Sequence, residues 1–131
     1  MRRDRVLLLP IALAAATGIV GVDPAHAAEA PPVVVDVSAH DDGTSLEVRA
    51  RYCSGDPVAA RHRVTFAVVD EAGGIVARQT LLRLSDRRCS SVGAAWSDAA
   101  LPPSANRVRV EVRNLRTGRS TRTPSLPVLA S

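Results

Sequence analysis

Aromatic residues are almost absent from this sequence, whose 131 residues include a single Phe, a single Tyr and a single Trp. The chain also has no Lys, only two Cys and only three His. So few large rings exclude an aromatic-rich core and predict a thin, aliphatic one. So few His and Cys leave no zinc-ligand spacing. All 17 basic residues are Arg and Ala and Val are abundant, which indicates a GC-rich bacterial genome and discounts the high isoelectric point as a functional signal.

The N-terminus has the order of regions that is typical of a cleaved secretory signal. Arg2, Arg3 and Arg5 precede an uncharged stretch from Val6 to Val22, and Ala25-His26-Ala27 then forms an A-x-A cleavage site. The apolar stretch is shorter than the roughly 20 residues of a spanning helix. We therefore predict a protein exported by the general secretory (Sec) route, which is secreted and does not span the membrane after cleavage.

Processing gives a first testable prediction. The intact mass of the exported protein should correspond to a chain that starts at Ala28, or within about three residues of it, because Ala28-Glu29-Ala30 offers a second cleavage site. A secreted or membrane-retained product that still carries Met1 to Val22 contradicts the prediction.

The remaining chain is long enough for one domain. The expected organisation is a signal peptide (1–27), a short linker (28–32), a β-sandwich domain (33–128) and a C-terminal tail (129–131). Without the signal the chain keeps 14 Arg against 11 acidic residues, a net charge of +3.

Alternation of apolar and polar residues predicts an all-β domain. The three clearest strands are Val35–Ala39, Leu46–Tyr52 and Arg107–Arg113. A hairpin is predicted where the turn-rich segment Asp70–Gly74 separates Val64–Val69 from Ile75–Gln79. Further candidate strands are Leu81–Leu84, Val92–Trp96 and Thr121–Leu126. About seven short strands without an amphipathic helix indicate an antiparallel β-sandwich.

The two cysteines predict a disulfide. Cys53 and Cys89 are an even pair in a short exported chain, and closing a loop of about 36 residues should stabilise the fold by roughly 4 kcal/mol. A metal pair, a reactive thiol and an intermolecular bridge are the alternatives. Cys53 has the opposite parity to Tyr52, and Cys89 is out of phase with Val92, so we expect the bridge at the rim and not through the centre of the sandwich.

Three segments resemble fibronectin type III domains. Thr44–Val48, Val108–Asn114 and Gly118–Ser120 are similar to that family's early strand and its penultimate strand and turn, and Pro31-Pro32 resembles its opening. The resemblance runs from Pro31 to about Val128.

This resemblance implies a fibronectin type III-like or immunoglobulin-like β-sandwich, most members of which are interaction modules or spacers. Ala50 stands where the family has a Trp and Asn106 where it has its corner Tyr, and the disulfide is not a family feature. The resemblance therefore transfers no binding residue.

The residues supply little for catalysis. His40-Asp41-Asp42 could ligate a cation but is more typical of a solvated turn. Ser54, His62 and Asp56 could be written as a triad, yet no nucleophile elbow or oxyanion glycine pattern accompanies them. We predict a protein that is not an enzyme and has no cofactor, no metal and no catalytic residue.

Two functional hypotheses from different classes remain, besides a third. The first is a module that binds an extracellular protein or envelope component through loops such as Ser54–Arg61. The second is a binder of anionic polymers, such as wall polymer, polysaccharide or nucleic acid without sequence specificity. The third is a secreted protease inhibitor that uses Ser54–Arg63.

The anion-binding hypothesis depends on the segment 107–122, which holds six Arg and one acid, Glu111. If the alternate valines of this strand are buried, its polar residues share the outer face. A solvated face that prevents edge pairing is the competing interpretation. The candidate anion-binding residues are Arg63, Arg107, Arg109, Arg113, Arg119 and Arg122.

Overall fold

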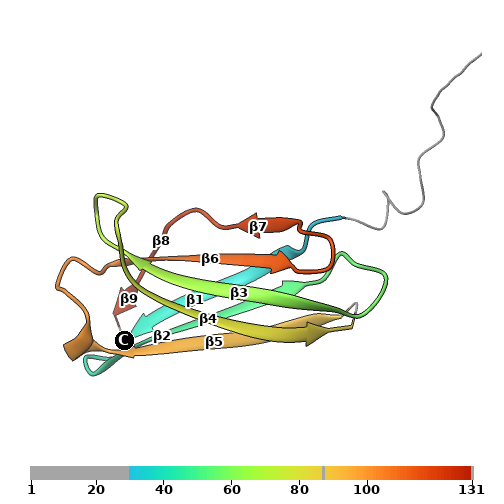
Figure 1. Ribbon diagram of the computed structural model, residues 1–131. Coiled ribbons are helices and arrows are strands. Elements are labelled where there is room, and N and C mark those ends of the chain that lie inside the picture. The colour runs from blue at the N-terminus through green and yellow to red at the C-terminus, as the bar shows by residue number, and fades with distance from the viewer. Residues whose placement is uncertain (1–29, 87, 131) are drawn as a thin grey trace, which may run out of the picture. The chain divides into compact units, whose positions relative to one another are not determined.

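The computed structural model describes residues 30–86 and 88–130, whose strands form the two sheets of a β-sandwich (Figure 1). One sheet has the strand order β5-β2-β1-β9, and the other has the order β4-β3-β6-β7, with β8 also paired to β6. The strands are β1 (Val33–Asp41), β2 (Ser45–Cys53), β3 (Ala60–Val69), β4 (Ile75–Ser85), β5 (Cys89–Ser97), β6 (Arg107–Asn114), β7 (Ser120–Arg122), β8 (Leu126–Pro127) and β9 (Leu129–Ala130). All pairings are antiparallel except that of β1 with β9.

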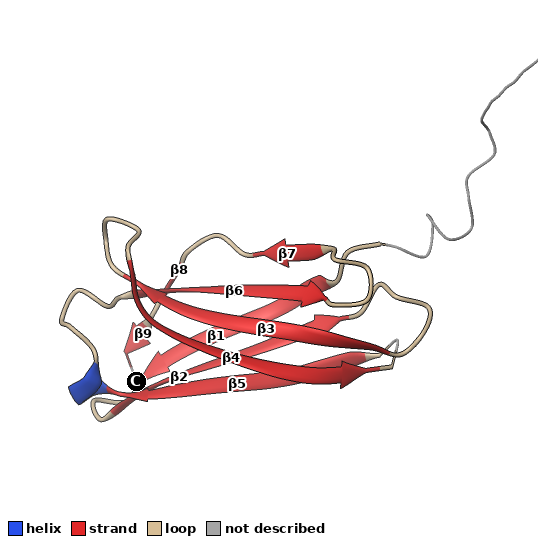
Figure 2. Ribbon diagram, in the orientation of Figure 1, coloured by secondary structure: helices blue, strands red, loops and turns tan. Residues whose placement is uncertain are grey.

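Helical structure is limited, within the described residues, to the 3-10 helix η1 (Asp98–Ala100) after β5 (Figure 2). No helix in this part of the chain is long and apolar enough to cross a membrane. The signal peptide predicted for residues 1–27 lies outside the described residues. Leu129 and Ala130, which the sequence assigns to a tail, continue the first sheet as β9.

The core lies between the two sheets and follows the period-two pattern of the sequence. In β2 the side chains from Leu46 to Tyr52 are alternately buried and exposed, and in β6 Val108, Val110 and Val112 are buried. The aromatic rings of the buried cluster are Phe66 and Tyr52, and the rest of the cluster is aliphatic. The outward faces of the same strands are therefore left to polar side chains.

The β3–β4 hairpin forms around the predicted turn. The Asp70 carboxylate accepts hydrogen bonds from the backbone N–H groups of Ala72 (3.0 Å) and Gly74 (2.8 Å), and Gly73 has a positive φ of 85°. The prediction of two separate strands after this turn was wrong, because β4 runs unbroken from Ile75 to Ser85. No residue there is of a turn-forming type, so the ladder with β3 continues.

The C-terminal strand differs from the sequence prediction in the opposite sense. The segment expected to form one strand over Thr121–Leu126 splits into β7 and β8. Pro124 lies between them and has no backbone N–H to donate to a ladder. Thr123 still bonds to β6, since its N–H donates to the Val110 carbonyl at 2.9 Å.

The disulfide between Cys53 and Cys89 is confirmed. These residues face each other as the terminal pair of the β2–β5 ladder. The bridge thus joins neighbouring strands of one sheet at its end, as side-chain parity predicted, and does not connect the two sheets. It fixes the end of the sheet where β2 leads into the loop before β3.

Side chains of β4 tie together the two sheets along one side. The Gln79 amide donates to the Ala95 carbonyl of β5 at 2.6 Å, and the Arg83 guanidinium donates to the Ser91 carbonyl at 3.5 Å. These bonds occupy carbonyl groups of an edge strand, which would otherwise be free to pair with another chain.

Candidate anion-binding site

The outer face of the second sheet is built from residues that alternate with the core. In the β3–β6 ladder, Arg63 lies opposite Arg113 and Thr65 lies opposite Glu111, while Ala67 lies opposite Arg109. Directly opposed residues of an antiparallel pair point to the same side of the sheet. Since the valines between these β6 residues are buried, the charged side chains share the outer face.

Strand pairing arranges this face in rows that cross the sheet. One row consists of Arg78, Ala67 and Arg109, on β4, β3 and β6. The next consists of Thr80, Thr65, Glu111 and Arg122, and the third of Leu82, Arg63, Arg113 and Ser120. Small side chains therefore lie between long cationic ones.

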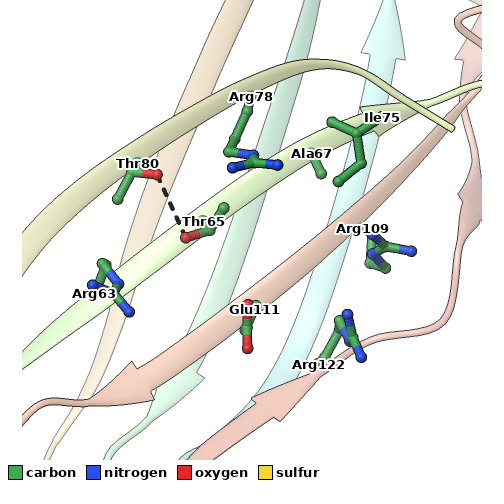
Figure 3. Close-up of a pocket in the computed structure, with 9 residues that line it drawn as sticks. All are labelled: Arg63, Thr65, Ala67, Ile75, Arg78, Thr80, Arg109, Glu111 and Arg122. Atoms are coloured by element: carbon green, nitrogen blue, oxygen red, sulfur yellow. Dashed lines mark hydrogen bonds between the residues drawn. The ribbon is translucent and has the colours of Figure 1, made fainter.

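These rows enclose a surface hollow of about 500 Å³, which we call the sheet basin (Figure 3). Thr65, Ala67 and Thr80 contribute short side chains to it, and the arginines extend around them. The sheet basin is lined by Arg63, Thr65, Ala67, Ile75, Arg78, Thr80, Arg109, Glu111 and Arg122.

The sheet basin is strongly cationic, with four guanidinium groups and the single carboxylate of Glu111. The bond drawn among its residues joins the hydroxyl groups of Thr65 and Thr80 at 3.5 Å (Figure 3). None of the four guanidinium groups has a hydrogen bond or an ion pair with the part of the chain that the structure describes. Their donors are thus available to a ligand.

The structure divides the six arginines proposed from the sequence. Arg63, Arg109 and Arg122 line the sheet basin. Arg113 lies on the same face beside Arg63, whereas Arg107 lies at the far end of β6, where its guanidinium donates to the Ser125 carbonyl at 3.5 Å. The remaining residue, Arg119, lies in the exposed turn between β6 and β7 and does not line the sheet basin.

Sequence analysis missed Arg78. This residue joins the sheet basin because the hairpin register places it opposite Ala67. A continuous β4 paired from the Asp70–Gly74 turn would have predicted that position, but the division of β4 into two strands removed the signal.

Arg116, the sixth arginine of the cationic segment, has a different role. It forms a two-pronged ion pair with the buried carboxylate of Asp56, with N···O distances of 2.6 and 2.9 Å. The Asn114 amide also donates to Asp56, at 2.9 Å. The Arg116 bonds lower the pKa of Asp56 to about 2, against the opposing effect of burial and with help from Asn114 and the Val58 N–H.

The three residues that could be written as a triad have other partners. His62 is fully buried and its Nδ1 lies 3.0 Å from the Ala60 carbonyl oxygen, while Asp56 is bonded to Arg116. The Ser54 hydroxyl accepts a hydrogen bond from the Asp56 N–H at 3.2 Å. These side chains position the β2–β3 loop and do not form a nucleophile–base pair.

The predicted turn at His40-Asp41-Asp42 is stabilised by its own backbone. The Asp42 carboxylate accepts from the N–H groups of Ser45 (2.9 Å) and Thr44 (2.8 Å), and these bonds lower its pKa to about 2. Residues 30–86 and 88–130 contain no group of three or more His, Cys, Asp or Glu that could hold a metal ion.

No family model matches this chain, and no curated protein matches it. Among solved structures, it is similar to a glycosyl hydrolase family 2 member from Bacteroides cellulosilyticus, with 20% identity and a TM-score of 0.47 over 74% of this chain and 14% of that one. It is also similar to β-glucosidase 3B from Thermotoga neapolitana, with 16% identity and a TM-score of 0.45 over 73% of this chain and 16% of that one. The chain thus spans 14–16% of these hydrolases, and what they bind or act on is not transferred to it.

Proposed function

We propose that this protein is an exported, non-enzymatic binding module that holds an anionic polymer in the sheet basin. The observation that carries the proposal is a set of four guanidinium groups that surround short side chains and make no bond to the described chain. Planar guanidinium groups bind phosphate, sulfate and carboxylate through paired hydrogen bonds.

The spacing of the arginines favours a polymer over a single small anion. Arg78 and Arg109 lie on the strands that flank β3, so their backbones are about 10 Å apart. Arg63 and Arg122 lie on other rows of the same face. One phosphate or sulfate group cannot meet all four cations, whereas successive groups along a polymer can.

The chemistry of the sheet basin also limits how a polymer is read. Its lining contains no aromatic side chain, so it offers no platform on which bases could stack. Binding should depend on the charge density of the polymer and on counterion release. Wall polymers and acidic polysaccharides are therefore the preferred class, with nucleic acid bound through its backbone alone.

Export supports the same class of ligand. The Cys53–Cys89 bridge suits an oxidising compartment, and the predicted signal peptide leads to the cell exterior. Anionic polymers of the envelope are abundant there. A protein partner that docks on the β2–β3 loop is the other form of the module hypothesis, and the experiment below separates the two.

The experiment compares two double variants that lose the same charge. Arg78→Ser with Arg109→Ser removes one row of the sheet basin, whereas Arg88→Ser with Arg119→Ser removes exposed cations outside it. Binding to heparin, teichoic acid and DNA is measured from low to physiological salt.

The sheet-basin variant should lose on the order of tenfold in affinity at low salt, and its salt slope should fall by about two charges. The control variant should stay within about threefold of the original protein. Equal losses in both variants would show that only net charge matters, and no binding by the original protein would leave the loop-docking hypothesis in its place.

A further inference from the structure

A second cluster of arginines lies on the outer face of the other sheet. In β2 the buried residues alternate with Arg49 and Arg51, which are exposed. Arg49 lies between Ser38 of β1 and Gly93 of β5. The next row is formed by Asp36, Arg51 and Ser91.

These rows enclose a hollow of about 420 Å³, which we call the β2–β5 basin. Its charged groups are the guanidinium groups of Arg49, Arg51 and Arg83 and the carboxylate of Asp36. As in the sheet basin, cations surround short side chains, here Ser38, Ser91 and Gly93.

Gly93 keeps the floor of the β2–β5 basin low. A Cβ atom at this position would lie 3.3 Å from the Val48 carbonyl oxygen and 3.8 Å from Cγ of Arg49. Any side chain there would crowd the Arg49 stem on the outer face. A glycine inside a strand often marks such a place, where a ligand or another backbone comes close.

Two bonds hold this basin in shape. Arg83 reaches from β4 to the border of the basin, where its guanidinium donates to the Ser91 carbonyl. The disulfide joins β2 to β5 two residues beyond the Arg51–Ser91 pair. The strands that carry Arg49 and Arg51 are thus covalently linked next to the basin.

We propose that the β2–β5 basin is a second site for the same anionic groups, so that one molecule bridges two polymer segments. This inference rests on the proposed function of the sheet basin. The two basins lie on the outer faces of two sheets packed about 10 Å apart, and the shared core holds them facing away from each other. A single extended segment that lies on one face does not reach the other, so filling both requires two segments.

The test measures how many short anions bind one chain. With a sulfated heparin tetrasaccharide as the probe, isothermal titration calorimetry should give two sites per chain. Arg49→Ser with Arg51→Ser and Arg78→Ser with Arg109→Ser should each leave one site. Thermal melting of both variants checks that these exposed substitutions keep the fold.

Long heparin chains supply the second readout. The original protein should raise light scattering to a maximum at an intermediate ratio of protein to polymer, because bridging needs both faces. Each double variant should still bind the polymer but lose this maximum. One site per chain that persists in Arg49→Ser/Arg51→Ser and disappears in Arg78→Ser/Arg109→Ser overturns the bridging inference alone, whereas no tetrasaccharide binding at all overturns the proposed function with it.

Discussion

Replacing both Cys53 and Cys89 by Ser should lower the free energy of unfolding by about 2–5 kcal/mol. The bridge closes a 36-residue separation, and without it the unfolded chain gains conformational freedom. The core that must hold the fold alone is thin, since its buried cluster is mostly valine and alanine. Urea unfolding of the oxidised protein and of the double variant measures the difference.

The original protein in reductant is the matched control, because it has the same sequence as the oxidised form. Its unfolding midpoint should fall to that of the double variant. Full thiol titration of the native oxidised protein contradicts the account, and so do equal midpoints with and without reductant.

Removing the Asp56 carboxylate should lower the free energy of unfolding by about 2–4 kcal/mol. In Asp56→Ala the Asn114 amide and the Val58 N–H lose their acceptor, and Arg116 loses its two-pronged partner. Asp56 is 2% exposed, so water cannot fully replace these bonds. Denaturant unfolding at neutral pH measures the loss.

The same residue predicts a pH dependence. Because the pKa of Asp56 is lowered from 3.8 to about 2 in the folded protein, its stabilising effect is complete above about pH 4 and is lost as the pH falls towards 2. Asp56→Asn should flatten this part of the stability profile. Asp42, whose pKa is also lowered to about 2, should leave a remainder.

An exposed carboxylate provides the control for both measurements. Asp86→Asn, in the segment between β4 and β5, should change neutral stability by less than about 0.5 kcal/mol. If Asp56→Ala and Asp86→Asn have equal stability, the Asp56–Asn114–Arg116 cluster does not hold the β2–β3 loop as described.

Local patterns in the sequence predict the faces of the strands well. Alternation in β2 and β6 identifies which side chains are buried, and the parity of Cys53 relative to Tyr52 places the bridge at the rim. These properties depend only on residues one or two apart along the chain. The same reasoning brings Arg63 onto the face of β6, since Arg63 lies opposite Arg113.

Properties that depend on partners far along the chain could not be predicted in this way. Arg116 resembles its neighbours in the sequence, and only the fold shows that it is paired with Asp56, 60 residues away. Arg78 joins the sheet basin through the hairpin register. The second cluster at Arg49 and Arg51 includes Arg83 because β4 passes beside β5.

The measurement that tests the central claim most directly is a heteronuclear NMR titration of the protein with a sulfated heparin tetrasaccharide, which observes the arginine Nε–Hε groups. The account predicts that the Nε–Hε resonances of Arg63, Arg78, Arg109 and Arg122 shift together and return as salt is added, because these groups line the sheet basin. Unchanged resonances of these four side chains at saturating tetrasaccharide would contradict it.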